Sequence, residues 1–147
     1  PKLLACPSDT GTKKVALDWS AGVNGFAHPA NRNNALSYVT GLDAFEQLGV
    51  TLMAGDRNLA GAEANLCKSV CDEGVAALDL KPPTGSVVWT NSTHRFKGHL
   101  AVSDGSVQRT GQQELRLVIL EAYRALTSGE IRTRLGSRPN IHVLPPR

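Results

Sequence analysis

The residues best suited to chemistry in this chain are histidines and carboxylates that are scattered along the sequence. The four histidines are His28, His94, His99 and His142. Their neighbourhoods lack the close His, Cys or Asp spacing of a zinc site, so the sequence predicts no metal site. Asp56 stands beside Arg57 after an apolar segment. A structural ion pair or a turn cap is favoured over catalysis for this pair.

The sequence offers no recognisable catalytic nucleophile. Ser106 follows Asp104-Gly105, but no Gly-x-Ser-x-Gly elbow surrounds it. The chain also has neither a phosphate-binding loop nor a dinucleotide-binding fingerprint. We therefore expect this protein not to be an enzyme and assign no catalytic residue.

The three cysteines are Cys6, Cys67 and Cys71. Cys67 and Cys71 are four positions apart with no histidine close behind them, which excludes a zinc knuckle and a haem-attachment motif. A disulfide between these two in a loop, or between either of them and Cys6, is geometrically feasible. Because the count is odd, at least one thiol stays free.

The charge distribution separates a neutral body from a basic tail. The chain has 147 residues and a formal net charge of +3. All of the excess falls in residues 130–147, which carry four arginines and a single acidic residue. Nucleic-acid binders usually present a basic face with interleaved aromatic residues, which this tail lacks. We expect a head domain over residues 1–129, a solvated Arg-rich tail over 130–147, and no nucleic-acid partner.

Two local patterns predict the elements around these residues. Asp104-Gly105, flanked by residues 99–103 and 106–109, predicts a β-hairpin with a two-residue type I′ turn. After it, apolar residues at helical spacing predict a helix over residues 112–127, with Thr110 as N-cap, Gln113 at N3 and Gly129 as C-cap.

The remaining pattern predicts short strands separated by turns. Strands are expected at residues 15–19, 36–42, 50–54 and 87–90, and residues 62–71 form either a short helix or one arm of a hairpin to 75–80. The expected fold class is α+β: an antiparallel sheet of about four to six short strands, one packed C-terminal helix and long ordered loops. No stretch reaches the roughly 20 apolar residues needed to span a bilayer.

One constellation is more specific than the others. His94 is followed by nine residues and then by Asp104-Gly105. This spacing resembles the prepilin-type processing-associated H-x9-DG domain of pilin-like (pseudopilin) type II secretion proteins of the Verrucomicrobia type. The resemblance covers roughly residues 3–126 and includes the segments at residues 4–9, 36–43, 54–59 and 89–108.

The resemblance implies a structural and assembly role. Such a protein would be the soluble head of a subunit in a type II secretion or type IV pilus-like system. It would be periplasmic or extracellular, in a cell-surface filament. Its partners would be other pilin-like subunits, including copies of itself, or secretion-system components. The apolar helix that anchors such heads is missing from these 147 residues, so we expect membrane contact only through that helix. Export to an oxidising space favours a disulfide at Cys67 or Cys71.

Two hypotheses remain for the motif itself. In the first, His94 bonds a backbone carbonyl or the Asp104 carboxylate and fixes the turn, so no cofactor is needed. Its rival is a calcium site, as the related major pilin-like proteins hold calcium in a C-terminal loop; calcium needs six to eight oxygen ligands. The alternative function is a secreted ligand-binding or hydrolytic domain with a cleft near His94, His99, Asp104 and Asp56. Convergence of those side chains would favour it.

Overall fold

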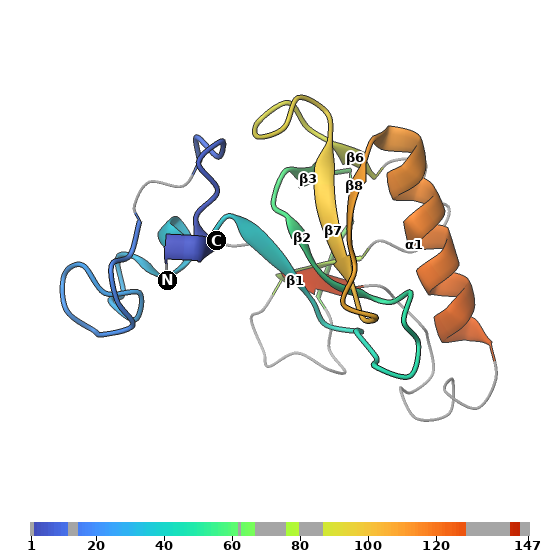
Figure 1. Cartoon of the computed structure of the whole chain (residues 1–147), viewed down its shortest axis with the longest axis horizontal. Coiled ribbons are helices and arrows are strands. Elements are labelled where there is room, and N and C mark those ends of the chain that lie inside the picture. Colours follow the sequence, from blue (N-terminus) through green and yellow to red (C-terminus); the bar gives the residue numbers. More distant parts are fainter. Residues whose placement is uncertain are drawn as a thin grey trace.

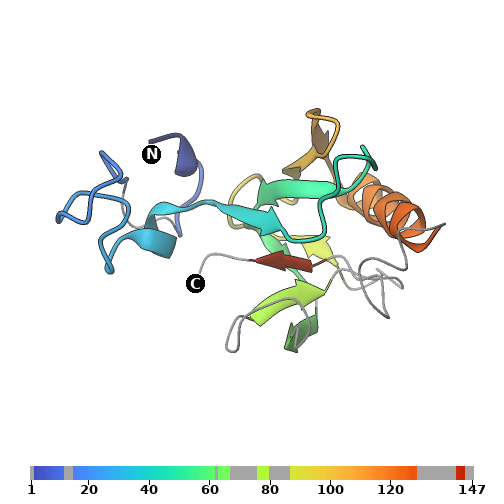
Figure 2. The same ribbon diagram turned by 90° about the horizontal axis from the view of Figure 1, so that it is seen from below.

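The computed structural model describes residues 2–11, 15–61, 63–66, 76–79, 87–128 and 142–144. Its largest element is a seven-stranded antiparallel sheet (Figures 1 and 2). In spatial order the strands are β4 (Glu63–Leu66), β5 (Ala76–Asp79), β9 (His142–Leu144), β1 (Tyr38–Gly41), β2 (Leu52–Asp56), β7 (Gly98–Val102) and β8 (Val107–Thr110). A second, two-stranded sheet pairs β3 (Leu59–Ala60) with β6 (Val88–Trp89).

The α+β class is confirmed: within the described residues one α-helix, α1 (Gln112–Thr127), follows the hairpin of β7 and β8. The strands β1, β2, β7 and β8 form a block of four, within the expected range, and β9, β5 and β4 extend it to seven. Two short 3-10 helices, η1 (Lys2–Leu4) and η2 (Arg32–Ala35), belong to the N-terminal segment. That segment lies to one side of the sheet, and α1 lies on the other (Figure 1).

The core lies between α1 and one face of the sheet. Burial alternates along β7, where Gly98, Leu100 and Val102 are buried while the residues between them are half-buried. This period of two is expected of a strand with one covered face. Trp89 of β6 is 1% exposed and fills the end of the core. The helix contributes Leu115, Ile119, Ala122 and Leu126.

The helix has the predicted bounds, but the predicted N-cap is wrong. The N-cap is Gly111, and Glu114 at N3 accepts a hydrogen bond from the Gly111 N–H at 3.0 Å. Thr110 is instead buried, where its hydroxyl oxygen accepts the indole N–H of Trp89 at 3.1 Å. The Thr110 hydroxyl therefore bonds within the core and does not cap the helix. The N3 side chain that bonds back to the N-cap is Glu114, one residue after the predicted Gln113. At the other end the C-cap is Ser128, and Gly129 lies outside the described residues.

The β7–β8 hairpin is confirmed, but its turn is not type I′. A type I′ turn needs positive φ at both central residues. Gly105 has φ +86°, whereas the described non-glycine residues with positive φ are Arg95 and Phe96. The Gly105 N–H donates to the Val102 carbonyl at 2.9 Å, and the Val102 N–H donates to the Ser106 carbonyl at 3.1 Å. This is the three-residue hairpin loop in which a turn is followed by a left-handed glycine.

The structure shifts the bounds of other expected strands and decides between the two alternatives for residues 62–80. The strand expected at residues 50–54 is β2 at Leu52–Asp56, and the segment at 36–42 shortens to β1. The hairpin alternative for residues 62–80 is correct, because β4 pairs with β5. No strand forms at residues 15–19, where Asp18 makes an isolated bridge with Gly25.

Part of the C-terminal segment belongs to the sheet. We expected residues 130–147 to leave the body, but β9 pairs with β1 on one side and β5 on the other. Within the described residues, no helix is long and apolar enough to cross a membrane.

Candidate functional site: a buried aspartate between two histidines

A row of polar side chains crosses the face of the sheet that is turned away from α1. Tyr38 of β1 is paired with Asp56 of β2. The β2–β7 register runs Ala54↔Ala101 and Gly55↔Leu100, which places His99 opposite Asp56. Residues opposite one another on neighbouring strands share a face and touch. The sheet itself therefore brings Tyr38, Asp56 and His99 together.

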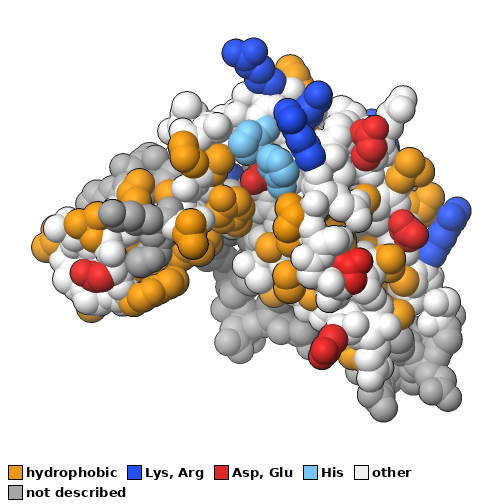
Figure 3. Space-filling view, in the orientation of Figure 1, with side chains coloured by type: hydrophobic (Ala, Val, Ile, Leu, Met, Phe, Trp, Pro, Cys, Tyr) orange, Lys and Arg blue, Asp and Glu red, His pale blue; other side chains and the backbone are white. Residues whose placement is uncertain are grey.

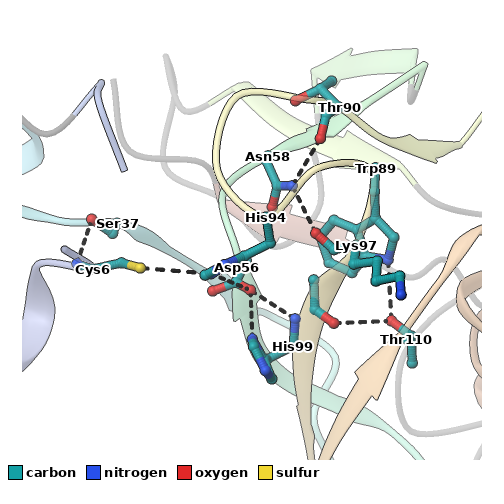
Figure 4. Close-up of polar contacts among 11 residues, drawn as sticks. Cys6, Ser37, Asp56, Asn58, Trp89, Thr90, His94, Lys97, His99 and Thr110 are labelled. Carbon is teal, nitrogen blue, oxygen red and sulfur yellow. Dashed lines mark hydrogen bonds and ion pairs between the residues drawn. The ribbon is translucent and has the colours of Figure 1, made fainter. Parts of the chain in front are cut away.

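Asp56 is the centre of the site (Figure 4). Its side chain is 3% exposed, and Oδ2 accepts the backbone N–H of His99 at 2.7 Å. The same oxygen lies 3.0 Å from His99 Nδ1 and 3.4 Å from His94 Nε2. A buried carboxylate needs such partners, because desolvation of an unpaired charge is costly.

His94 reaches the site from the loop between β6 and β7. Asn58 fixes both ends of this loop, since its Nδ2 donates to the carbonyls of Thr90 at 3.2 Å and Lys97 at 3.0 Å. Between them, Arg95 and Phe96 have φ of 51° and 62°, a conformation that non-glycine residues rarely adopt. Backbone strain of this kind persists where surrounding contacts over-determine it, often at functional sites.

Cys6 lies beside His94 and comes from the N-terminal segment. Its Sγ lies 3.6 Å from His94 Nε2. The Cys6 backbone N–H donates to Ser37 Oγ at 2.9 Å, and the Ser37 N–H donates to the Leu4 carbonyl at 2.8 Å. These bonds hold the segment against the approach to β1. Cys6 is a free thiol in the structure, whereas Cys67 and Cys71, and any disulfide between them, lie outside the described residues.

The adjacent residues Asp56 and Arg57 suggested an ion pair with each other, but Arg57 pairs with another carboxylate. Its Nε lies 3.3 Å from Oδ2 of the buried Asp9, and its NH1 donates to the Leu36 carbonyl at 3.1 Å. Asp56 and Arg57 thus form two separate links, one to the histidines and one to the N-terminal segment. The structural interpretation of Arg57 holds with a different partner.

The site gathers acidic groups around Tyr38. Burial raises the pKa of the Tyr38 hydroxyl, and the nearby Cys6, Asp56 and Asp9 raise this pKa further. Each of these three neighbours opposes a new negative charge on the tyrosine.

The geometry does not match a nucleophile–histidine–aspartate triad. In a triad the two ring nitrogens of histidine have separate tasks, one toward the nucleophile and the other toward the carboxylate. Here the single nitrogen Nε2 of His94 faces both Cys6 Sγ and Asp56 Oδ2. Several potential ligand atoms instead converge, because one atom each from Asp56, His94 and His99 lies within 4.8 Å of the others.

The second half of the H-x9-DG spacing lies elsewhere. Asp104 follows the end of β7, whereas His94 precedes its beginning, so the proposed His94–Asp104 contact is wrong. Asp104 Oδ1 accepts the Ser106 N–H at 2.7 Å, which lowers the pKa of this exposed carboxyl. Among the described residues, Asp104 belongs to no group of three or more His, Cys, Asp or Glu ligands. The calcium hypothesis gains no support from its surroundings.

The alternative hypothesis placed Asp56, His94, His99 and Asp104 at one cleft, and the structure brings the first three together at a single site without Asp104. The spacing argument against zinc missed it, because these residues come from one strand end, one loop and the next strand. The contributions of Cys6 and Asp9 were missed altogether. The Asp56–His99 contact could have been predicted from the alternating burial along β7 together with the correct register of β7 against β2.

On the surface, histidine side chains lie next to one another with Lys and Arg side chains nearby (Figure 3). The side chains of His94 and His99 are 21% and 44% exposed, so the site is open to solvent. A shallow hollow lined by Lys97, Arg109, Thr110, Gly111 and Glu114 contains none of the clustered residues. No family model, no curated protein and no solved structure matches this chain.

Proposed function

We propose that this chain is a structural module, the soluble head domain of a pilin-like (pseudopilin) subunit of a type II secretion or type IV pilus-like system. One observation carries the proposal: polar residues in segments 54–59 and 89–108, which carry the H-x9-DG resemblance, hydrogen-bond one element of the fold to another. Asp56 links β2 to β7, Asn58 fixes the loop before β7, and Asp104 closes the hairpin. This is the use expected of residues that define a scaffold.

The arrangement also suits a head domain on a filament. Such a domain has to fold on its own before it packs against other subunits. Its hydrophobic core is covered by α1, and the side chain of Asp56 lies on the sheet face turned away from α1. In this proposal the protein acts outside the cytoplasm, in the periplasm or at the cell surface, with pilin-like subunits as partners.

The filament assignment is tested in the cells that produce the protein. Antibodies against the purified domain are used on surface filaments removed by shearing, on the periplasmic fraction and on the cytoplasm. The proposal predicts the chain in the sheared-filament or periplasmic fraction, as part of a longer polypeptide with an apolar N-terminal helix. A cytoplasmic protein without such a helix would contradict it.

We further propose that the domain is not an enzyme. The support is the arrangement of His94, whose one ring nitrogen faces both the thiol and the carboxylate. Esterase, peptidase and glycosidase substrates should show no turnover above buffer, with or without added metal. Turnover that disappears in His94→Ala would overturn this part of the proposal.

The disulfide between Cys67 and Cys71 stays a prediction. Cys6 lies beside His94 as a free thiol, which leaves those two as partners for one another. Exported protein alkylated without reductant should carry one label by intact mass. Three labels would contradict the disulfide.

A ligand-binding domain is the second candidate. It is favoured by the convergence of Asp56, His94 and His99, three of the four residues assigned to that alternative. Asp104 is absent from the cluster, so a cleft that includes all four is not formed. What the three can bind follows from their ligand atoms.

A further inference from the structure

We propose that Asp56, His94 and His99 bind one divalent transition-metal ion of the zinc class, with Cys6 as the fourth ligand. The inference rests on the positions of these four side chains, and it holds whether or not the chain is a pilin-like head. It replaces the expectation, drawn from spacing, that the protein has no metal site.

Three of the distances between ligand atoms are close to those around a tetrahedral ion. Zinc bonds of about 2.0–2.3 Å to nitrogen, oxygen and sulfur place neighbouring ligands about 3.3–3.6 Å apart. Cys6 Sγ is 3.6 Å and Asp56 Oδ2 is 3.4 Å from His94 Nε2, and Asp56 Oδ2 is 3.0 Å from His99 Nδ1. Two of these three separations fall in the range, and the third is a few tenths of an ångström short. The group of ligand atoms that all lie within 4.8 Å of one another comprises Asp56, His94 and His99 without Cys6. Cys6 touches this group at His94, so its Sγ must move toward the other two ligands to become the fourth. The rings of His94 and His99 are perpendicular, with centroids 5.2 Å apart.

The types of ligand atom select the kind of metal. Imidazole nitrogen and thiolate sulfur suit zinc and similar ions, whereas calcium and magnesium prefer oxygen alone. One carboxylate and one thiolate together carry two negative charges, which a divalent cation neutralises.

The surroundings fix the ligands in the way metal sites require. Asp56 is held by the His99 N–H, and the loop carrying His94 is held at both ends by Asn58. Contacts that orient the ligands are a regular part of metal sites. The partial exposure of His99 gives an ion a route from solvent.

Four protein ligands make this a structural rather than a catalytic centre. Catalytic zinc sites keep one position for water, and structural sites fill all four. Cys6 lies on the N-terminal segment, whereas the other three ligands lie on β2, on β7 and on the loop before it. The ion would therefore tie the N-terminal segment to the sheet. This role explains why a site with histidines and a thiol has no triad geometry.

The test uses the full chain after treatment with chelator. Zinc is titrated by calorimetry, and cobalt(II) is added as a spectroscopic substitute. We expect one ion per chain, visible cobalt bands of tetrahedral intensity, and a thiolate-to-cobalt charge-transfer band in the near ultraviolet. Failure of the parent chain to bind zinc, or octahedral cobalt bands without thiolate character, would overturn the proposal.

Variants assign the ligands. Loss of a contact that orients a ligand costs about 10–100-fold in affinity, so His94→Ala and His99→Ala should each cost at least about 100-fold. Cys6→Ser should remove the charge-transfer band, while Cys67→Ser/Cys71→Ser should keep it. His28→Ala is the matched histidine control and should bind as the parent does. A charge-transfer band that persists in Cys6→Ser, or equal losses in His28→Ala and His94→Ala, would contradict the assigned ligands.

Discussion

The two halves of the H-x9-DG spacing lie at opposite ends of β7 and make different kinds of contact. At its beginning, His94 and His99 meet Asp56 and Cys6, which come from other parts of the chain. At its end, Asp104 and Gly105 form a turn, and the carboxylate accepts a hydrogen bond from Ser106 two residues later. One end depends on tertiary structure, and the other depends largely on local sequence.

This difference separates the consequences of substitution. The buried carboxylate at one end satisfies a backbone donor and two imidazoles, and water cannot replace it there. The exposed carboxylate at the other end bonds to Ser106, and water can take the place of that partner. The same residue type should therefore have very different effects on the free energy of unfolding.

The largest effect is expected for Asp56→Ala. It leaves the His99 N–H without its acceptor and removes the buried group that links β7 to His94, so the loss should be about 3 kcal/mol. Asp104→Ala is the matched aspartate control and should cause a much smaller loss. Urea unfolding of both variants measures the contrast. Equal losses would contradict the distinction between the two ends.

Gly105→Val should have the next largest effect. Gly105 has φ +86°, and a β-branched residue in that region is strained by about 2 kcal/mol. No atom lies within 4 Å of the place a Cβ would take, so the cost comes from the backbone rather than from a clash. Gly105→Asn, which tolerates positive φ better, should lose less in the same unfolding experiment. The interpretation fails if the two variants are equally stable.

A smaller effect is expected from the titration of Asp104. The Ser106 N–H lowers the pKa of Asp104 below the ordinary value of 3.8. A lowered folded-state pKa stabilises the fold above the unfolded pKa, and this contribution is lost as pH falls through the folded value. Asp104→Asn should therefore differ slightly from the parent at neutral pH and match it in strong acid. Thermal melts across this pH range test it, and a difference that grows in acid would have the wrong sign.

The smallest effect is on Tyr38. Its raised pKa should appear as a late step in the ultraviolet titration of tyrosine, which Tyr38→Phe removes. Because the folded state holds the hydroxyl proton more tightly, this residue's contribution to stability is lost as pH rises through its folded pKa. Bound zinc should lower the Tyr38 pKa by offsetting the charge of Cys6 and Asp56. An unchanged titration in zinc-saturated protein would count against a cation at this site.

Local patterns in the sequence predicted the elements well. The apolar spacing of α1 and the Asp-Gly signal of the hairpin depend on residues close in sequence, and both elements formed where expected. Two details were wrong: the hairpin loop has three residues instead of two, and the helix N-cap is Gly111 instead of Thr110. Those details were decided by tertiary demands, such as the use of the Thr110 hydroxyl by Trp89.

The candidate site could be predicted only in part. Asp56, His94 and His99 were identified from their residue types, but their convergence depends on the register of β2 against β7 and on the path of the strained loop. Cys6 is 88 positions from His94, and nothing in its local sequence indicates this contact. Spacing rules for zinc sites detect ligands that are close in the chain, which these are not.

The most direct test of the account compares thermal unfolding with and without zinc in chelator-treated parent, His94→Ala and Asp104→Asn. At free zinc about 100-fold above Kd, binding stabilises the parent by about 2.7 kcal/mol, which should raise its Tm by roughly 8 °C. We expect the same shift in Asp104→Asn, little or none in His94→Ala, and none in any of the three with calcium. A zinc shift retained in His94→Ala, or a calcium shift in the parent that vanishes in Asp104→Asn, would contradict the account.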